Sequence, residues 1–229
     1  TIADTQLTAA NNFSGATLTL ARNGGANSQD VFSASGTLAA LTQGGNLTVG
    51  GTTIGTVTTN DAGTLLLTFN ASATNALVNS AMRQIAYSNS SDTPPASAQI
   101  DWTFSDGNSG AQGTGGALSA TGSTTVAITA ANDAPVVTSA SLTVIEGQTV
   151  TLSGADFAVT DPDSASLIYT ISSLNGGTFQ LSSAAGTPIT SFTSAQLSAG
   201  LVQFVDDGNE VAPSFSVTVN DGAADSNTL

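Results

Sequence analysis

Short runs with an apolar residue at every second position recur along the chain and predict β-strands. Residues 16–20, 65–69 and 100–104 alternate in this way, and turns rich in Gly and Asn separate such runs. Because successive side chains of a strand point to opposite faces, each run predicts a strand with one buried face, and Ile100, Trp102 and Phe104 are expected to be buried together. Many short strands of this kind are typical of an antiparallel β-sandwich. We therefore expect an all-β protein, with residues 107–122 as a long loop or ragged hairpin.

Two segments follow a helical period instead. Apolar residues recur at three- and four-residue spacing between Ala73 and Ile85, which predicts a short amphipathic helix over residues 74–84. Residues 193–196 have the pattern of a capping box, and Gly200 stands where a glycine would end a helix of one or two turns. Each helix is expected to lie in a connection of its sandwich.

The order of these segments repeats once along the chain. A helix, a strand, an Asp-containing loop with a proline, a second strand and an Asp-Gly pair run from residue 74 to 107 and again from residue 193 to 222. We therefore expect two copies of one domain type, residues 1–131 and 132–229. The first copy lacks an equivalent of residues 136–152, and the second ends before an equivalent of the strand at 124–128. This offset predicts a slice of a tandem array, with an N-terminal strand missing from one domain and a C-terminal strand from the other.

The charged residues exclude several classes of function. Lys and Arg number 2 against 16 Asp and Glu, so the net charge of −14 argues against a nucleic-acid or anionic-membrane surface. The absence of Cys and His removes the usual zinc sites, Ser-His-Asp triads and Cys-His pairs, and the absence of Lys removes Schiff-base catalysis. Asp101 and Asp106 lack the signals of a glycosidase pair, and no apolar run approaches the roughly 20 residues of a membrane span. We expect no enzyme.

The acids cluster where the two copies meet. Residues 1–131 carry a net charge of −4, whereas residues 132–229 carry −10 with no base. Asn132-Asp133-Ala134-Pro135 follows the strand at 124–128. Asp161-Pro162-Asp163 comes later, within the second copy, and Asp221-Gly222 follows the last strand. Carboxylate and amide oxygens suit calcium. The other interpretation is that the first motif is a turn that ends a strand and the second a surface β-turn.

With these motifs, the chain resembles the cadherin-like repeats of large bacterial surface adhesins, including the chondroitin-sulfate-proteoglycan-type repeats. The resemblance implies two tandem cadherin-like, immunoglobulin-related Greek-key β-sandwiches with Ca²⁺ bound at their joint. The positions that match the family's calcium ligands are Asn132, Asp133, Asp161, Asp163 and Asp221, with Asp92 from the preceding domain. Ala130 and Ala134 stand where the fuller linker carries Asp and Asn, and Asp92 stands alone where two acids are usual. We therefore expect one ion at this joint.

The resemblance also implies a function. The chain is expected to be a structural, calcium-stiffened segment of a secreted or cell-surface bacterial adhesin whose partners are the neighbouring repeats of the same chain. An alternative is a β-sandwich module that binds a cell-surface glycan or protein. Trp102, Tyr87 and Tyr169 could then stack on a sugar, although their alternating strands favour core packing. A third alternative is homophilic adhesion through open strand edges.

Overall fold

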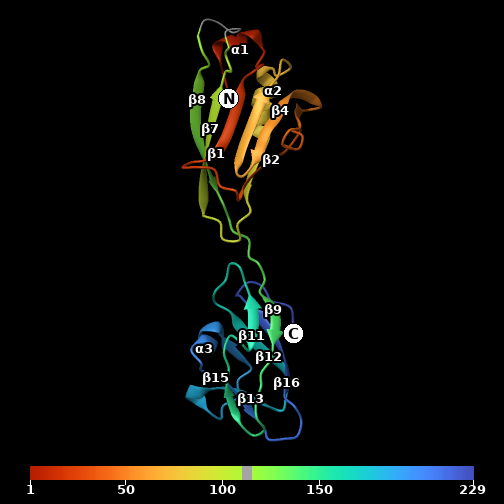
Figure 1. Ribbon diagram of the computed structural model, residues 1–229, viewed down its shortest axis with the longest axis vertical. Helices are drawn as coiled ribbons and strands as arrows, with labels where there is room; N and C mark the ends of the chain where they lie inside the picture. The colour runs from red at the N-terminus through yellow and green to blue at the C-terminus, as the bar shows by residue number, and fades with distance from the viewer. Residues whose placement is uncertain (110–114) are drawn as a thin grey trace. The chain divides into compact units, whose positions relative to one another are not determined.

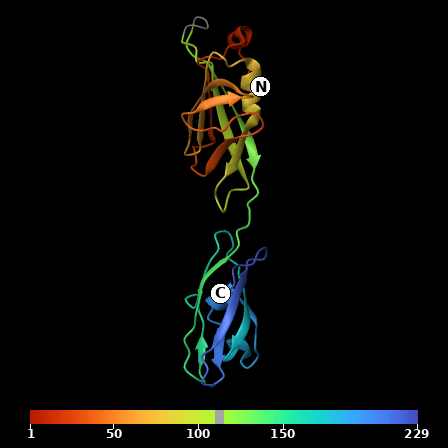
Figure 2. The same cartoon turned by 90° about the vertical axis from the view of Figure 1, so that its right-hand side faces the viewer.

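The computed structural model describes residues 1–109 and 115–229, so residues 110–114 of the expected loop lie outside the described part. The described residues form an all-β protein with a few short helices. The chain divides into two compact units, Thr1–Ala130 and Ala131–Leu229, called unit 1 and unit 2 below. Figure 1 labels the elements, and Figure 2 gives the view turned by 90°.

Unit 1 consists of two antiparallel sheets. The larger has the strand order β3-β4-β5-β1-β7-β8, and the smaller pairs β2 with β6. Its strands are β1 (Thr17–Arg22), β2 (Asp30–Ala34), β3 (Asn46–Val49), β4 (Thr52–Asp61), β5 (Thr64–Phe69), β6 (Ile85–Asn89), β7 (Ser97–Ser105) and β8 (Ser119–Ala127). The alternation in β5 buries Leu65, Leu67 and Phe69, as predicted, and these residues belong to one core between the sheets.

The predicted helix of unit 1 is α2 (Asn75–Gln84), whose first turn is capped by the hydroxyl of Thr74. A further helix, α1 (Thr5–Ala10), was not predicted. Asp4 caps it by accepting hydrogen bonds from Gln6 and Leu7, and Leu7 is its one buried residue. A single apolar contact gives no helical period, so the pattern of the sequence could not reveal α1.

The expectation for Trp102 was wrong. Ile100 and Phe104 are buried, but Trp102 on the same face of β7 is only half-buried. Its indole ring lies over Gly122 of the neighbouring strand β8, where an added Cβ would come within 2.4 Å of the ring. The face of β7 around Trp102 is therefore less completely covered than the face around its neighbours.

Unit 2 consists of three small antiparallel sheets, β10-β15-β13, β11-β9 and β14-β12-β16. Its strands are β9 (Val136–Ala140), β10 (Thr149–Thr151), β11 (Phe157–Thr160), β12 (Ile168–Asn175), β13 (Gly177–Leu181), β14 (Ser191–Thr193), β15 (Val202–Asp206) and β16 (Ser214–Asn220). Stacked and edge-to-face aromatic rings fill the core, among them Phe179, which is fully buried and lies 5.3 Å from Phe204 between ring centroids.

The predicted helix of unit 2 is α3 (Ser194–Ser198). Thr193 and Gln196 form the capping box from both sides, and Gly200 follows with φ +66, a left-handed conformation that favours glycine. A single 3₁₀ turn, Ser182–Ala184, also lies in unit 2.

Strand pairing follows the same order in both units. In unit 1, β1 pairs with β5 and β7, and α2 leads into β6, which pairs with β2. In unit 2, β12 pairs with β14 and β16, and α3 leads into β15, which pairs with β13. One difference stands out, because β15 also pairs with β10 on its other edge.

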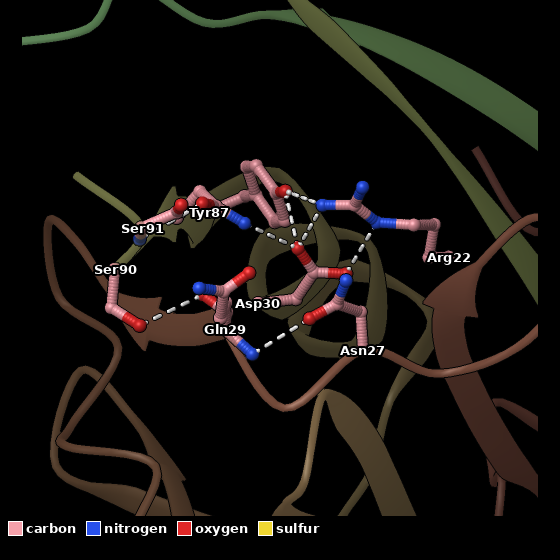
Figure 3. A network of polar contacts seen from close by, with 8 residues as sticks. Arg22, Asn27, Gln29, Asp30, Tyr87, Ser90 and Ser91 are labelled. Carbon is pink, nitrogen blue, oxygen red and sulfur yellow. Dashed lines mark hydrogen bonds and ion pairs between the residues drawn. The ribbon is translucent and has the colours of Figure 1, made fainter. Parts of the chain in front are cut away.

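A buried ion pair joins the two sheets of unit 1 (Figure 3). Arg22 of β1 donates from Nε to the Asp30 carboxylate of β2 at 2.8 Å. The same carboxylate accepts hydrogen bonds from Tyr87 at 2.7 Å and Asn89 at 2.9 Å, both from β6. The Asp30 side chain is fully buried, so this network ties β2 and β6 to the larger sheet.

The network also shifts the pKa of the groups in it. Burial alone would raise the pKa of Asp30, but the hydrogen bonds from Arg22, Tyr87 and Asn89 outweigh it, so that the pKa lies below its usual value. The pKa of Arg22 is raised, chiefly by its hydrogen bond to Asp30. Both groups therefore stay charged at neutral pH.

Removing the charge of Asp30 is expected to destabilise unit 1. Asp30→Asn leaves Arg22 without its buried partner, and breaking such a pair costs about 3 kcal/mol of unfolding free energy. Urea unfolding followed by the fluorescence of Trp102, the only Trp of the chain, measures this in unit 1 alone. The matched control is Asp61→Asn, at an exposed carboxylate. Equal unfolding midpoints for the two variants would contradict the structural role of the pair.

Unit 1 is also expected to lose stability in acid through Asp30. Because the pKa of Asp30 is lower in the folded state, its contribution is complete above the unfolded pKa of about 3.9 and is lost as pH falls further, through the folded-state value. The difference in unfolding free energy between the wild type and Asp30→Asn should therefore shrink as pH falls below about 4. A difference that stays constant from pH 7 to 2.5 would argue against this linkage.

Candidate metal centre

Three segments of unit 2 bring predicted site residues together. Residues 132–133 lead into β9, residues 161–163 connect β11 to β12, and Asp221 follows β16. The Asn132 side-chain amide donates to Asp221 Oδ2 at 2.8 Å. The backbone N–H of Asp133 donates to Asp163 Oδ2 at 3.2 Å. The segment before β9 is thus tied to both of the other segments.

The Asp161–Asp163 loop is organised by the first of its two acids. Asp161 Oδ1 accepts hydrogen bonds from the backbone N–H of Asp163 at 3.1 Å and of Ser164 at 2.7 Å. This is the turn that Asp favours with or without a metal. It accounts for one oxygen of Asp161 and leaves the other for a different partner.

Two oxygens of this loop have no partner. Asp161 Oδ2 and Asp163 Oδ1 are buried side-chain atoms without a hydrogen bond, and among the described residues they are the only such atoms. Buried polar atoms are almost always paired, because the loss of hydration is otherwise uncompensated. Two such atoms from neighbouring acids therefore indicate an unmet requirement for a positively charged or hydrogen-bonding partner.

The negative charges of the loop repel one another. The pKa of Asp163 is raised even though its largest single influence, the hydrogen bond from the Asp133 backbone, lowers it. Desolvation and the neighbouring carboxylates of Asp161 and Asp133 together outweigh that bond. A cation placed among these carboxylates would reverse this balance.

The carboxylate of Asp221, unlike that of Asp163, is stabilised in its charged form. Its pKa is lowered by hydrogen bonds from the backbone N–H groups of Ala224 and Ala223 and from the side chain of Asn132. Both of its oxygens already accept hydrogen bonds, Oδ1 from the backbone and Oδ2 from Asn132. Asp221 therefore holds Asn132 in place and is less available as a ligand than Asp161 and Asp163.

Not all predicted ligands converge. Within residues 1–109 and 115–229, no three Asp or Glu side chains come together closely enough to hold a metal ion. Asp92 is an exposed residue of unit 1, between β6 and β7, and its part in the site stays a prediction. The donor set nevertheless fits a hard cation in kind, with carboxylate and amide oxygens from three segments and two of those oxygens unpaired.

Acids outside this cluster have local structural roles. Asp206 accepts hydrogen bonds from the backbone N–H groups of Gly147 at 2.8 Å and Gly208 at 2.9 Å. Asp106 does the same for Asn108 and Leu118. The buried Asp30 was not singled out from the sequence, since Arg22 lies eight residues away on a strand of the other sheet. One signal in the sequence could have pointed to this pair. Arg22, one of only two arginines in the chain, lies in a strand of alternating apolar residues, where a charged side chain needs a partner.

Comparison with protein-family models finds a similarity in unit 2. Residues 135–229 match the family model described as cadherin-like, a range that includes Asp161, Asp163 and Asp221. No curated protein and no solved structure matches the chain. No helix within the described residues is long and apolar enough to cross a membrane. Unit 2 is therefore similar to cadherin-like domains in sequence, and its β-sandwich agrees with the match.

Proposed function

We propose that the chain is a structural segment of a secreted or cell-surface bacterial adhesin, in which Ca²⁺ bound at unit 2 restrains the linker before β9. The observation that carries this proposal is the pair of buried, unpaired oxygens on Asp161 and Asp163. The cadherin-like match of residues 135–229 supports an extracellular module of adhesive or structural type.

Calcium takes six to eight oxygen ligands. In the proposed site Asp161 and Asp163 provide the first of them, and Asp133, Asn132 and Asp221 lie on the segments already tied to this loop. Binding would neutralise like charges that now repel and draw the carboxylates together. The chain contributes only ligands and no reactive group to this role, so we propose no catalytic activity.

The consequence of such binding is mechanical. Residues 132–133 belong to the segment that joins the two units, and an ion that holds them against unit 2 removes freedom from that segment. Neighbouring repeats of the chain are proposed as the partners of unit 2. Restricted linkers would make a tandem array of such units stiff in calcium and flexible without it.

The alternative, a carbohydrate-binding module, has no specific observation in its favour. Tyr169 is buried in the core of unit 2. Trp102 and Tyr87 line a hollow whose other walls are mostly apolar. Sugar recognition requires several polar groups beside the aromatic faces. Apart from the two aromatic residues, Thr124 is the one polar side chain among the residues that line this hollow.

Asp163→Asn is expected to separate the role of the charge from the role of the fold. In chelator the variant should melt no lower than the wild type, because it removes a carboxylate that its neighbours repel. In calcium the wild type should gain about 2.7 kcal/mol at a hundredfold excess of the ion over its dissociation constant. The variant should gain much less. Calorimetry of the full chain measures both.

Glu210→Gln is the matched control, since it removes one exposed negative charge from another loop of unit 2. It should keep the full response to calcium. A wild-type melting curve that is the same in calcium and in chelator would overturn the calcium proposal.

Asp133→Ala is expected to weaken the restraint of the linker while both units stay folded, because no core residue changes. Small-angle scattering of the wild type should give a narrow range of particle dimensions in calcium and a broad range in chelator. The variant should give the broad range at moderate calcium. If calcium raises the melting temperature of unit 2 but leaves the scattering unchanged, the ion stabilises one domain and the stiffening role is wrong.

A further inference from the structure

The side-chain amide of Asn132 has one orientation that its surroundings allow. Its Nδ2 donates to Asp221 Oδ2 at 2.8 Å and to the backbone carbonyl of Asp133 at 3.2 Å. An ionised carboxylate and a carbonyl only accept hydrogen bonds, so a reversed amide would turn its own oxygen toward two acceptors. These two contacts therefore fix which end of the amide carries the oxygen.

The same contacts leave the amide oxygen of Asn132 open. Asn132 is exposed, and within the described residues no group donates to its Oδ1. Both oxygens of Asp221 are already used, because Oδ1 accepts from the backbone N–H groups of Ala223 and Ala224, both at 2.7 Å, and Oδ2 accepts from Asn132. Amide oxygens are ordinary ligands of calcium. Of these two side chains, Asn132 is the one with an oxygen to offer to a cation.

Asp221 does not add a third acid to the pair formed by Asp161 and Asp163. Among the described residues, no three acidic side chains lie close enough together to hold one metal ion. The connection runs through the segment before β9, which contacts Asp163 by the Asp133 N–H and Asp221 by the Asn132 side chain. Asp221 therefore reaches the candidate site through Asn132.

The backbone of this segment is held by contacts that do not involve Asp221. The side chain of Asn227 accepts from the Val137 N–H at 2.9 Å and donates to the Val137 carbonyl at 3.0 Å. Val137 is itself buried, and the Asp133 N–H is bound by Asp163. A change at Asp221 would therefore release the side chain of Asn132 without releasing the segment.

We propose that Asp221 is a positioning residue of the calcium site, which orients Asn132 so that Asn132 Oδ1 binds the ion, and that Asp221 is not itself a ligand; this role rests on the proposed function. It differs from the role of ligand that the resemblance to cadherin-like repeats implies for Asp221. Direct binding by Asp221 Oδ2 would give up a charge-assisted hydrogen bond and would leave the Asn132 amide free to turn.

A double-mutant cycle in calcium affinity tests this role. Calcium chloride is titrated calorimetrically into the full chain of the wild type, Asp221→Asn, Asn132→Ala and the double variant. Each single variant should weaken binding by about tenfold to hundredfold, as loss of a group that orients a ligand does. The double variant should bind no more weakly than Asn132→Ala, because Asp221 acts only through Asn132. Losses that multiply would make Asp221 a ligand and overturn the proposal.

An exchange of the two side chains provides a rescue. Asn132→Asp alone should weaken calcium binding although it adds a carboxylate, because that carboxylate is repelled by Asp221. Asn132→Asp combined with Asp221→Asn again places an amide opposite a carboxylate and should recover most of the affinity. Tighter binding by Asn132→Asp alone would contradict the positioning role.

Asp225→Asn is the matched control, since Asp225 also accepts a hydrogen bond from an asparagine side chain, that of Asn220 at 2.7 Å. It should keep the calcium affinity of the wild type, and a loss as large as that of Asp221→Asn would overturn the specific role of Asp221.

A measurement in chelator tests the contact without calcium. The side-chain NH2 group of Asn132 should be ordered on the picosecond to nanosecond timescale in the wild type and mobile in Asp221→Asn, while both proteins keep the same melting temperature. Equal order in the two proteins would overturn the positioning role alone. A wild type that binds no calcium would overturn the proposed function, and the role of Asp221 with it.

Discussion

Most of the described strands bury apolar side chains on one face, and the structure depends on covering that face. In unit 1 the six-stranded sheet is covered by a smaller layer, the β2–β6 pair with its helices, so the attachment of that layer is critical. The Arg22–Asp30 pair supplies a fixed point, because one carboxylate joins β1, β2 and β6. A buried ion pair adds little net stability compared with apolar packing, but it specifies one arrangement of the two layers.

The scarcity of bases shapes the rest of the molecule. Both arginines belong to unit 1, and Arg22 forms the buried ion pair there. Unit 2 has ten acids and no base. Its carboxylates are therefore satisfied by backbone N–H groups, as at Asp206 and Asp221, and each such acid fixes a turn. Asp161 follows the same rule with one oxygen only. Asp161 Oδ2 and Asp163 Oδ1 accept no hydrogen bond, so a bound cation would stabilise these two oxygens most.

Periodicity predicted what depends on local pattern, and tertiary contacts decided the remainder. Strands β1, β5 and β7, α2 and the capping box of α3 follow from residue spacing, and so does the Asp161–Asp163 loop, whereas β8 begins at Ser119 within the expected loop or ragged hairpin. The Asp30 network could not be predicted, because its members come from three strands in two sheets. Trp102 was predicted to be buried because its alternation matches that of Ile100 and Phe104. The pattern identifies the inward face of a strand but does not show whether another element covers it.

The two units share an order of strand pairing but differ in what each leaves unsatisfied. In unit 2, β15 pairs with β10 on its second edge and two carboxylate oxygens stay unpaired. In unit 1, the buried Asp30 is paired with Arg22, and the second edge of β6 has no paired strand among the described residues. An edge strand is usually protected by Lys, by Pro or by a bulge, and β6, with the sequence Ile-Ala-Tyr-Ser-Asn, has none of these. Tyr87 of this strand also lines a mostly apolar hollow together with Trp102. The second edge of β6 is therefore the place in the described part of unit 1 where strand pairing is least complete.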